Sequence, residues 1–185
     1  MFIEVKKFID DAFQNSLYGS GSIKHFERTV DWLKMLKPDA DEPMLIAAYA
    51  HDIERAFRKT DSTETFKSIA FNDETFLAHH QSRGADIVRV FLRDNGYPDE
   101  ATQRVYRMIY HHEVGGDEES NFIKDADSIS YLENNTQLHI GLTSSLGVEK
   151  IKEKVDWMFE RITSPRAKAL AQPFYNSAIA KLGGN

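Results

Sequence analysis

The chain has 185 residues, of which 41% are hydrophobic and 28% charged, a composition typical of one soluble globular domain. The net charge of −6 argues against polymeric nucleic acid as a partner, and no apolar run approaches the roughly 18 residues of a membrane span. Cysteine is absent, which excludes disulfides and thiolate metal sites. Together with an N-terminus unlike a signal peptide, this favours a cytoplasmic location.

Hydrophobic residues recur with the period of an α-helix nearly everywhere. Apolar stripes predict helices at about residues 2–13 and 22–36. Asp41 and Pro43 predict the start of a third helix, which carries the stretch AAYAHDIERAF at residues 47–57. In this stretch small apolar residues flank the adjacent polar residues His51 and Asp52. Their setting raises the question of whether the pair has a function.

From residue 58 to residue 75 the chain is polar and weakly periodic. This length predicts a functional loop or a short helix beneath one, and the segment is a candidate substrate lid. Further helices are expected at residues 76–93, 99–113, 121–133, 148–162 and 166–182.

No pattern of period two, repeat or linker interrupts these helices. The sequence therefore predicts an all-α fold, with residues 1–185 forming a single compact bundle. The motif-bearing core is expected at about residues 22–135, with the helices at 148–182 packing on it. Periodicity leaves open whether those last helices complete the core or form the surface of a homodimer.

Six of the seven histidines fall in the predicted helices between residues 22 and 113. A single histidine usually has only a local structural role. The position of each histidine on its helix therefore decides whether it is a candidate metal ligand. His112 follows Val105 and Ile109 at the spacing of one helix face, which is apolar. Asp127 lies in a segment that otherwise has the pattern of core, and a buried carboxylate requires a partner or a metal.

His51 and Asp52 are separated by about 100° around a helix axis, so both can face one point from the same side of the bundle. Histidine nitrogens combined with aspartate oxygens, without sulfur, suit Fe, Mn or another divalent ion. The pattern therefore indicates a metal site built from several helices.

Five elements of the chain resemble, in order, the motifs of the HD-domain superfamily, whose members are helical metal-dependent phosphohydrolases. Three match its His, His-Asp and Asp elements: His25 in KHFERTV, His51-Asp52 in AHDIERAF and Asp127 in KDADSISYLE. Two match the further histidines of its binuclear members: His80 in HQSRGA and His112 in VYRMIYHH. The resemblance covers residues 25–133. Because it includes the two further histidines, the chain resembles the binuclear members of the superfamily.

The resemblance implies one divalent ion held by four residues: His25, His51, Asp52 and Asp127. It implies a second ion that shares Asp52 and adds His80 with either His111 or His112. Helix phase favours His112, whereas the spelling HHE leaves His111 open. Two ions are expected, with Fe or Mn favoured and Mg, Ni, Co or Zn as alternatives.

Two other histidines are expected outside this ligand set. His79 is expected at the surface or beside the ligands, and His139, beyond the last motif, is expected to be structural. Glu54 and Glu113 are candidates for moving protons.

The resemblance implies a phosphohydrolase that acts on a nucleotide or another small phosphorylated metabolite through a metal-bound hydroxide, with Asp52 as the bridge. Arg28, Arg55 and Lys124 each lie about one helical turn from an expected ligand. They are candidate contacts for the substrate phosphate, with solvated surface charge as the alternative.

Two other functions remain open. The same ligand set serves in a minority of the superfamily as a di-iron site that activates O₂ and cleaves C–C or C–P bonds. A sensing module without turnover is the third interpretation, and the complete ligand set argues against it.

Overall fold

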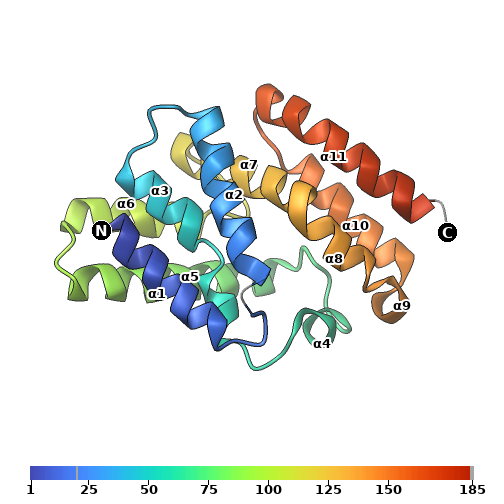
Figure 1. Cartoon of the computed structure of the whole chain (residues 1–185), viewed down its shortest axis with the longest axis horizontal. Coiled ribbons are helices and arrows are strands. Elements are labelled where there is room, and N and C mark those ends of the chain that lie inside the picture. Colours follow the sequence, from blue (N-terminus) through green and yellow to red (C-terminus); the bar gives the residue numbers. More distant parts are fainter. Residues whose placement is uncertain (20, 184–185) are drawn as a thin grey trace.

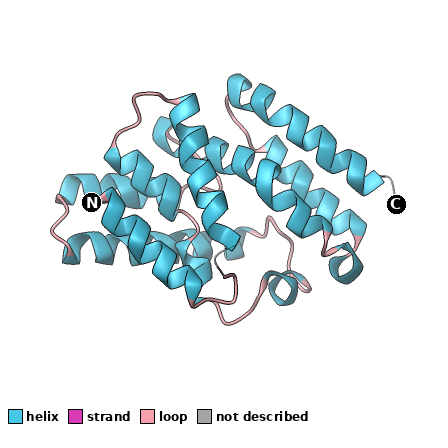
Figure 2. Cartoon of the chain, in the orientation of Figure 1, coloured by secondary structure: helices cyan, strands magenta, loops and turns pink. Residues whose placement is uncertain are grey.

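The structure, a computed structural model, describes residues 1–19 and 21–183. Within these ranges the backbone forms helices and turns and no strand (Figure 2), which confirms the all-α fold. In chain order the elements are α1 (Phe2–Gln14), α2 (Gly21–Leu36), α3 (Glu42–Ala50), η1 (Ile53–Phe57), α4 (Ser62–Phe66), α5 (Glu74–Asp94), α6 (Asp99–Tyr110), α7 (Glu118–Ser130), η2 (Tyr131–Asn135), α8 (Thr136–Ile140), α9 (Thr143–Leu146), α10 (Val148–Glu160) and α11 (Pro165–Gly183).

Helices α2 and α3 lie in the middle of the fold (Figure 1). Helix α3 packs against α1, α2, α6 and α7, and α5 pairs with α6. At the right of Figure 1, α10 and α11 pair with each other and lie against α7 and η2. One cluster of buried hydrophobic side chains runs from Val5 of α1 to Leu182 of α11, so the C-terminal helices contribute to the same core.

Helix α3 ends earlier than the sequence predicts. Asp41 caps its first turn by accepting a hydrogen bond from the backbone N–H of Met44 at 3.4 Å. The α-helix stops at Ala50, and the N–H of Arg55 donates to the carbonyl of Asp52 at 3.0 Å, which begins the 3₁₀ turn η1. The expectation of one helix through residue 57 is therefore wrong, and the tighter turn lets His51 and Asp52 both lie buried.

Two other helix ends also differ from the prediction. Helix α6 stops at Tyr110 rather than continuing to residue 113, because the chain reverses through Gly115, whose φ is 74°. Glycine has no Cβ atom and adopts a positive φ without steric cost, whereas other residues adopt it at a cost. Helix α7 begins earlier than predicted and continues into the wider π-helical turn η2. The turn after α6 bears His112 and Glu113, which belong to the candidate metal centre described below.

Segment 58–75 contains the short helix α4, and α8 and α9 add two short helices that the sequence pattern does not predict. In the described part of the chain, none of the helices combines the length and the apolar composition needed to cross a bilayer.

Candidate metal centre

Four buried histidines use the same ring nitrogen to anchor themselves to the protein. Their Nδ1 atoms lie 2.7–2.9 Å from oxygens of the chain. The pairs are His25 with Ser130 Oγ, His51 with the carbonyl of Ala48, His80 with Glu54 Oε2, and His112 with the carbonyl of Ile109.

These hydrogen bonds fix the tautomer of the rings. A carbonyl oxygen only accepts, so His51 and His112 carry their proton on Nδ1. The Ser130 hydroxyl donates to the carbonyl of His25 at 2.8 Å, so it accepts from the Nδ1–H of His25. In the neutral ring the Nε2 lone pair is then free to bind a metal, which is the usual arrangement of a ligating histidine.

Two of the free nitrogens have no partner. Across residues 1–19 and 21–183, nothing forms a hydrogen bond with the buried Nε2 atoms of His51 and His112, and the two ring centroids are 5.2 Å apart. A buried polar atom left unpaired costs about 1–3 kcal/mol. Two such atoms in one place therefore fit a metal ion better than they fit a purely structural role.

The first group of possible ligands consists of His25, His51 and Asp52, whose ligand atoms lie within 4.8 Å of one another. Asp127 adjoins this group. Its Oδ1 atom lies 3.1 Å from His25 Nε2 and 3.4 Å from His51 Nε2. The structure thus brings together the residues from α2, α7 and the turn after α3 that the sequence assigns to one ion.

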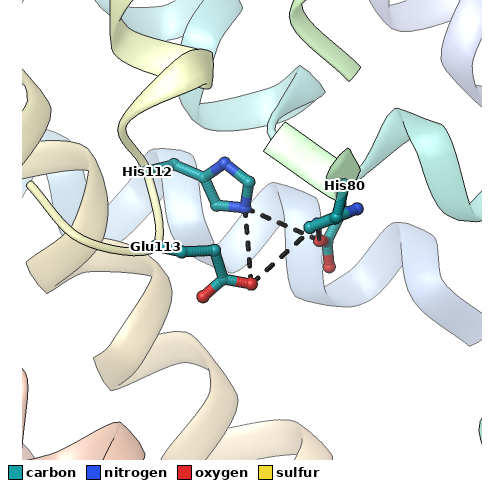
Figure 3. A group of neighbouring side chains, drawn as sticks. His80, His112 and Glu113 are labelled. Carbon is teal, nitrogen blue, oxygen red and sulfur yellow. Dashed lines mark hydrogen bonds and ion pairs between the residues drawn. The ribbon is translucent and has the colours of Figure 1, made fainter. Parts of the chain in front are cut away.

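The second group consists of Asp52, His80, His112 and Glu113, again within 4.8 Å (Figure 3). Asp52 Oδ1 lies 3.0 Å from His80 Nε2 and 3.9 Å from His112 Nε2, whereas Asp52 Oδ2 lies 3.7 Å from His51 Nε2. The two oxygens of one carboxylate therefore face the two groups. This is the geometry that a bridging ligand requires.

Electrostatics keep Asp52, Asp127 and His112 in the protonation states that bind metals, whereas His51 has to release a proton first. Burial acts to lower the pKa of His51, but the charges of Asp127 and Asp52 raise it to about 9. Burial alone would raise the pKa of Asp52, but the charges of Arg55 and His51 hold it well below its usual value. Burial opposes ionisation of Asp127 in the same way, and Arg161 with His51 holds its pKa low. Burial lowers the pKa of His112 to about 4, so this ring stays neutral.

Arg161 and Glu113 complete the cluster beyond what the sequence motifs indicate. Arg161, directly after α10, forms ion pairs with Glu113 and Asp127, and its Nε–H donates to Ser128 Oγ at 2.8 Å. Arg161 lies 34 residues after Asp127 of the last motif, so no motif spacing points to it. Glu113 directly follows His112, and that adjacency is the sequence signal for it.

Of the three cations expected at the site, the structure brings Arg55 to the cluster, with its Nε 3.1 Å from Asp52 Oδ1. Arg28 instead pairs with Glu133 at 2.9 Å and with Asp31. Lys124 donates to Thr163 Oγ1 at 2.7 Å.

The remaining histidines lie outside both groups. His111 is half-buried at the end of α6, with its ring beside that of Tyr110, and His79 is exposed. His139 packs with its ring centroid 5.3 Å from that of Tyr131. Of the adjacent pair His111 and His112, it is therefore His112 that joins a possible ligand group.

A comparison with protein families gives one match. The family described as Domain of unknown function (DUF4202) matches residues 11–180. The chain belongs to this family. The DUF4202 match spans both ligand groups and also α10 and Arg161, so the family's unit includes the C-terminal helices. No curated protein and no solved structure matches the chain.

Proposed function

We propose that this DUF4202 protein is a metal-dependent phosphohydrolase of the HD-domain type, acting on a nucleotide or another small phosphorylated metabolite. The observation that carries the proposal is the position of Asp52, whose two oxygens face two buried groups of histidines. In this proposal His25, His51, Asp52 and Asp127 hold one divalent ion, and Asp52, His80, His112 and Glu113 hold a second.

The donor set suits Fe or Mn, because it combines imidazole nitrogens with carboxylate oxygens and contains no sulfur. When bound, such ions supply Lewis-acid polarisation of a phosphoryl oxygen and a water of lowered pKa.

The chain's own residues hold the ligands in place. Glu54 accepts from His80 Nδ1 at 2.8 Å, and Arg58 in turn donates to Glu54 at 2.6 Å. Partners of this kind fix ring orientation, and their loss typically costs about 10–100-fold in metal affinity or activity. Arg55, beside Asp52, offers a fixed cation to a substrate phosphate.

The direct test is metal analysis of the purified protein, Mn²⁺ and Fe²⁺ titration, and a screen of nucleoside mono-, di- and cyclic phosphates and sugar phosphates. Asp52→Asn is expected to abolish Mn²⁺ binding and phosphate release while the circular dichroism of the helices is kept. Asp86→Asn, which changes an exposed carboxylate on α5, is the matched control and is expected to behave like the wild type.

A protein that binds neither ion would refute the proposal. If the protein instead holds iron, consumes O₂ and releases no phosphate from any substrate, the di-iron oxygenase is the correct assignment.

A further inference from the structure

A buried lysine without a counter-ion lies near Arg161 of the candidate metal centre, because both cations lie over the Trp157 ring, at 4.3 and 4.7 Å from its centroid. Lys154 of α10 is 7% exposed, and its Nζ lies over the rings of Trp157, Tyr131 and Phe71 at 4.3, 5.4 and 5.6 Å from their centroids. In the ranges that the structure describes, no carboxylate lies within ion-pair distance of this ammonium group. A buried charge without a carboxylate partner is costly, and the aromatic rings around Lys154 offset part of that cost.

Two more polar atoms of the same neighbourhood are unpartnered. Tyr131 Oη and His139 Nδ1 are buried and have no hydrogen-bond partner among the described residues. The Tyr131 ring lies 5.4 Å from Lys154 Nζ, and the charges of Arg55, Arg161 and Asp127 all act on the pKa of its hydroxyl, which burial raises. Lysine and tyrosine both donate hydrogen bonds, and an anion would accept from both.

The charge balance of the centre points to an anion as well. Apart from the exposed Arg83, which lies 3.7 Å from Glu54, the cluster and its surroundings hold four carboxylates and four cations: Asp52, Glu54, Glu113 and Asp127 against Arg55, Arg58, Lys154 and Arg161. Each divalent ion adds two positive charges to this balanced set. A loaded centre is therefore positive in a buried place, and an anionic ligand is what restores neutrality.

A cavity adjoins Arg55 and His139 of this neighbourhood. Arg55 and His139 line a space of about 260 Å³ whose other walls include Tyr18, Asn135, Leu138 and Leu142. Pockets for drug-sized ligands span roughly 300–1,000 Å³, so this cavity suits a smaller molecule with polar and apolar groups.

We propose that Lys154, Arg161, Arg55 and the Tyr131 hydroxyl bind the phosphate group of a small monophosphate ester, whose remaining part occupies the cavity beside Arg55. The assignment rests on the proposed function, because it places this phosphate at the metal centre. It adds residues from η2 and α10, which lie beyond the motif-bearing segment, to the substrate site.

The test is calorimetric titration of inorganic phosphate into the metal-free and the Mn²⁺-loaded protein. Lys154→Met keeps the length of the side chain within the aromatic rings and removes the charge. We expect it to weaken phosphate binding by at least about tenfold in both forms, since a hydrogen bond to a charged group is lost. Lys152→Met, on an exposed part of the same helix, is the matched control and should bind phosphate like the wild type.

A melting experiment separates ligand binding from a structural role. Because Lys154 has no counter-ion, Lys154→Met is expected to keep or raise the melting temperature, whereas a lysine needed for folding would lower it. Tyr131→Phe removes only the unpartnered hydroxyl. It is expected to weaken phosphate binding severalfold without lowering the melting temperature. If Lys154→Met does not fold, phosphate binding by Tyr131→Phe tests the anion site instead.

The outcomes distinguish this inference from the proposed function. Wild-type phosphate affinity in Lys154→Met, or no phosphate binding by the Mn²⁺-loaded wild type, would refute the anion site even if Mn²⁺ binds normally. Phosphate binding that depends on Lys154 in a protein that binds no Mn²⁺ would support the anion site and refute the metal-dependent hydrolase.

Discussion

His111 and His112 are adjacent in the chain but differ in the properties that decide metal ligation. His112 is fully buried, its Nδ1 is bonded to the carbonyl of Ile109 at 2.7 Å, and its Nε2 has no partner in the described chain. His111 is half-buried and outside both ligand groups. The spelling HHE cannot separate the two, because the choice depends on where α6 ends and how the chain then turns.

This difference gives a prediction for the single residues. His112→Ala is expected to weaken Mn²⁺ binding by at least about 100-fold, which is the upper end of the loss for an indirect partner. His111→Ala is expected to leave Mn²⁺ affinity within about twofold of the wild type, because it removes no atom from either group. Calorimetric Mn²⁺ titration of both variants, with circular dichroism to check folding, measures this. An equal loss in both would mean that both rings contribute.

At the scale of elements, apolar periodicity predicts the helices that bear most of the possible ligands. Periodicity does not predict where those helices end. Helix α3 stops at Ala50 and α6 at Tyr110, since their ends depend on contacts with other helices and on a glycine at positive φ. These ends are what turn Asp52 and Glu113 inward.

The sequence motifs do not indicate Lys154 of α10 or Arg161 directly after it, for a different reason, although the sequence holds a signal for one of them. Lys154 stands between Ile151 and Val155 on the apolar stripe that continues to Met158. A lysine on the apolar face of a helix is unusual, because burial of its charge is costly. What Lys154 and Arg161 face depends on the packing of α10 on α7 and η2, which no local pattern contains.

The approach of α5 to the turn after α3 gives a prediction for an element. A Cβ atom at Gly84 would lie 3.5 Å from the carbonyl oxygen of His51 and 3.7 Å from Glu54 Cβ, which is ordinary contact. Gly84→Ala therefore fits and is expected to raise stability by up to about 1 kcal/mol through helix propensity. Gly84→Leu does not fit. We expect it to lower stability by about 1–3 kcal/mol and to weaken Mn²⁺ binding, because α5 also carries His80.

Urea denaturation and Mn²⁺ titration of the two variants test this geometry, with alanine as the control for loss of the glycine itself. Unchanged stability and metal affinity in Gly84→Leu would show that α5 can move away from His51 without disturbing the centre.

At the scale of the whole molecule, the possible ligands come from segments spread over residues 25–127: α2, the turn after α3, α5, the turn after α6, and α7. An ion bound at this point would connect elements that belong to the single buried core. The carboxylates of the centre already form ion pairs with Arg55, Arg58 and Arg161, so the metal-free fold has compensated charges. We therefore expect the metal-free protein to be folded, in contrast to small domains that fold only when metal binds.

Metal binding is then expected to raise stability by mass action. At a free Mn²⁺ concentration 100 times the Kd, the gain is about 2.7 kcal/mol per site when the unfolded chain does not bind. Thermal melts over a range of Mn²⁺ concentrations should show a melting temperature that rises with concentration and returns to its starting value on chelation. Because the ligands span α2 to α7, amide exchange should slow in these helices together rather than at one end of the fold. Asp52→Asn should remove the dependence on Mn²⁺. A metal effect confined to one helix would place the bound ion outside the centre.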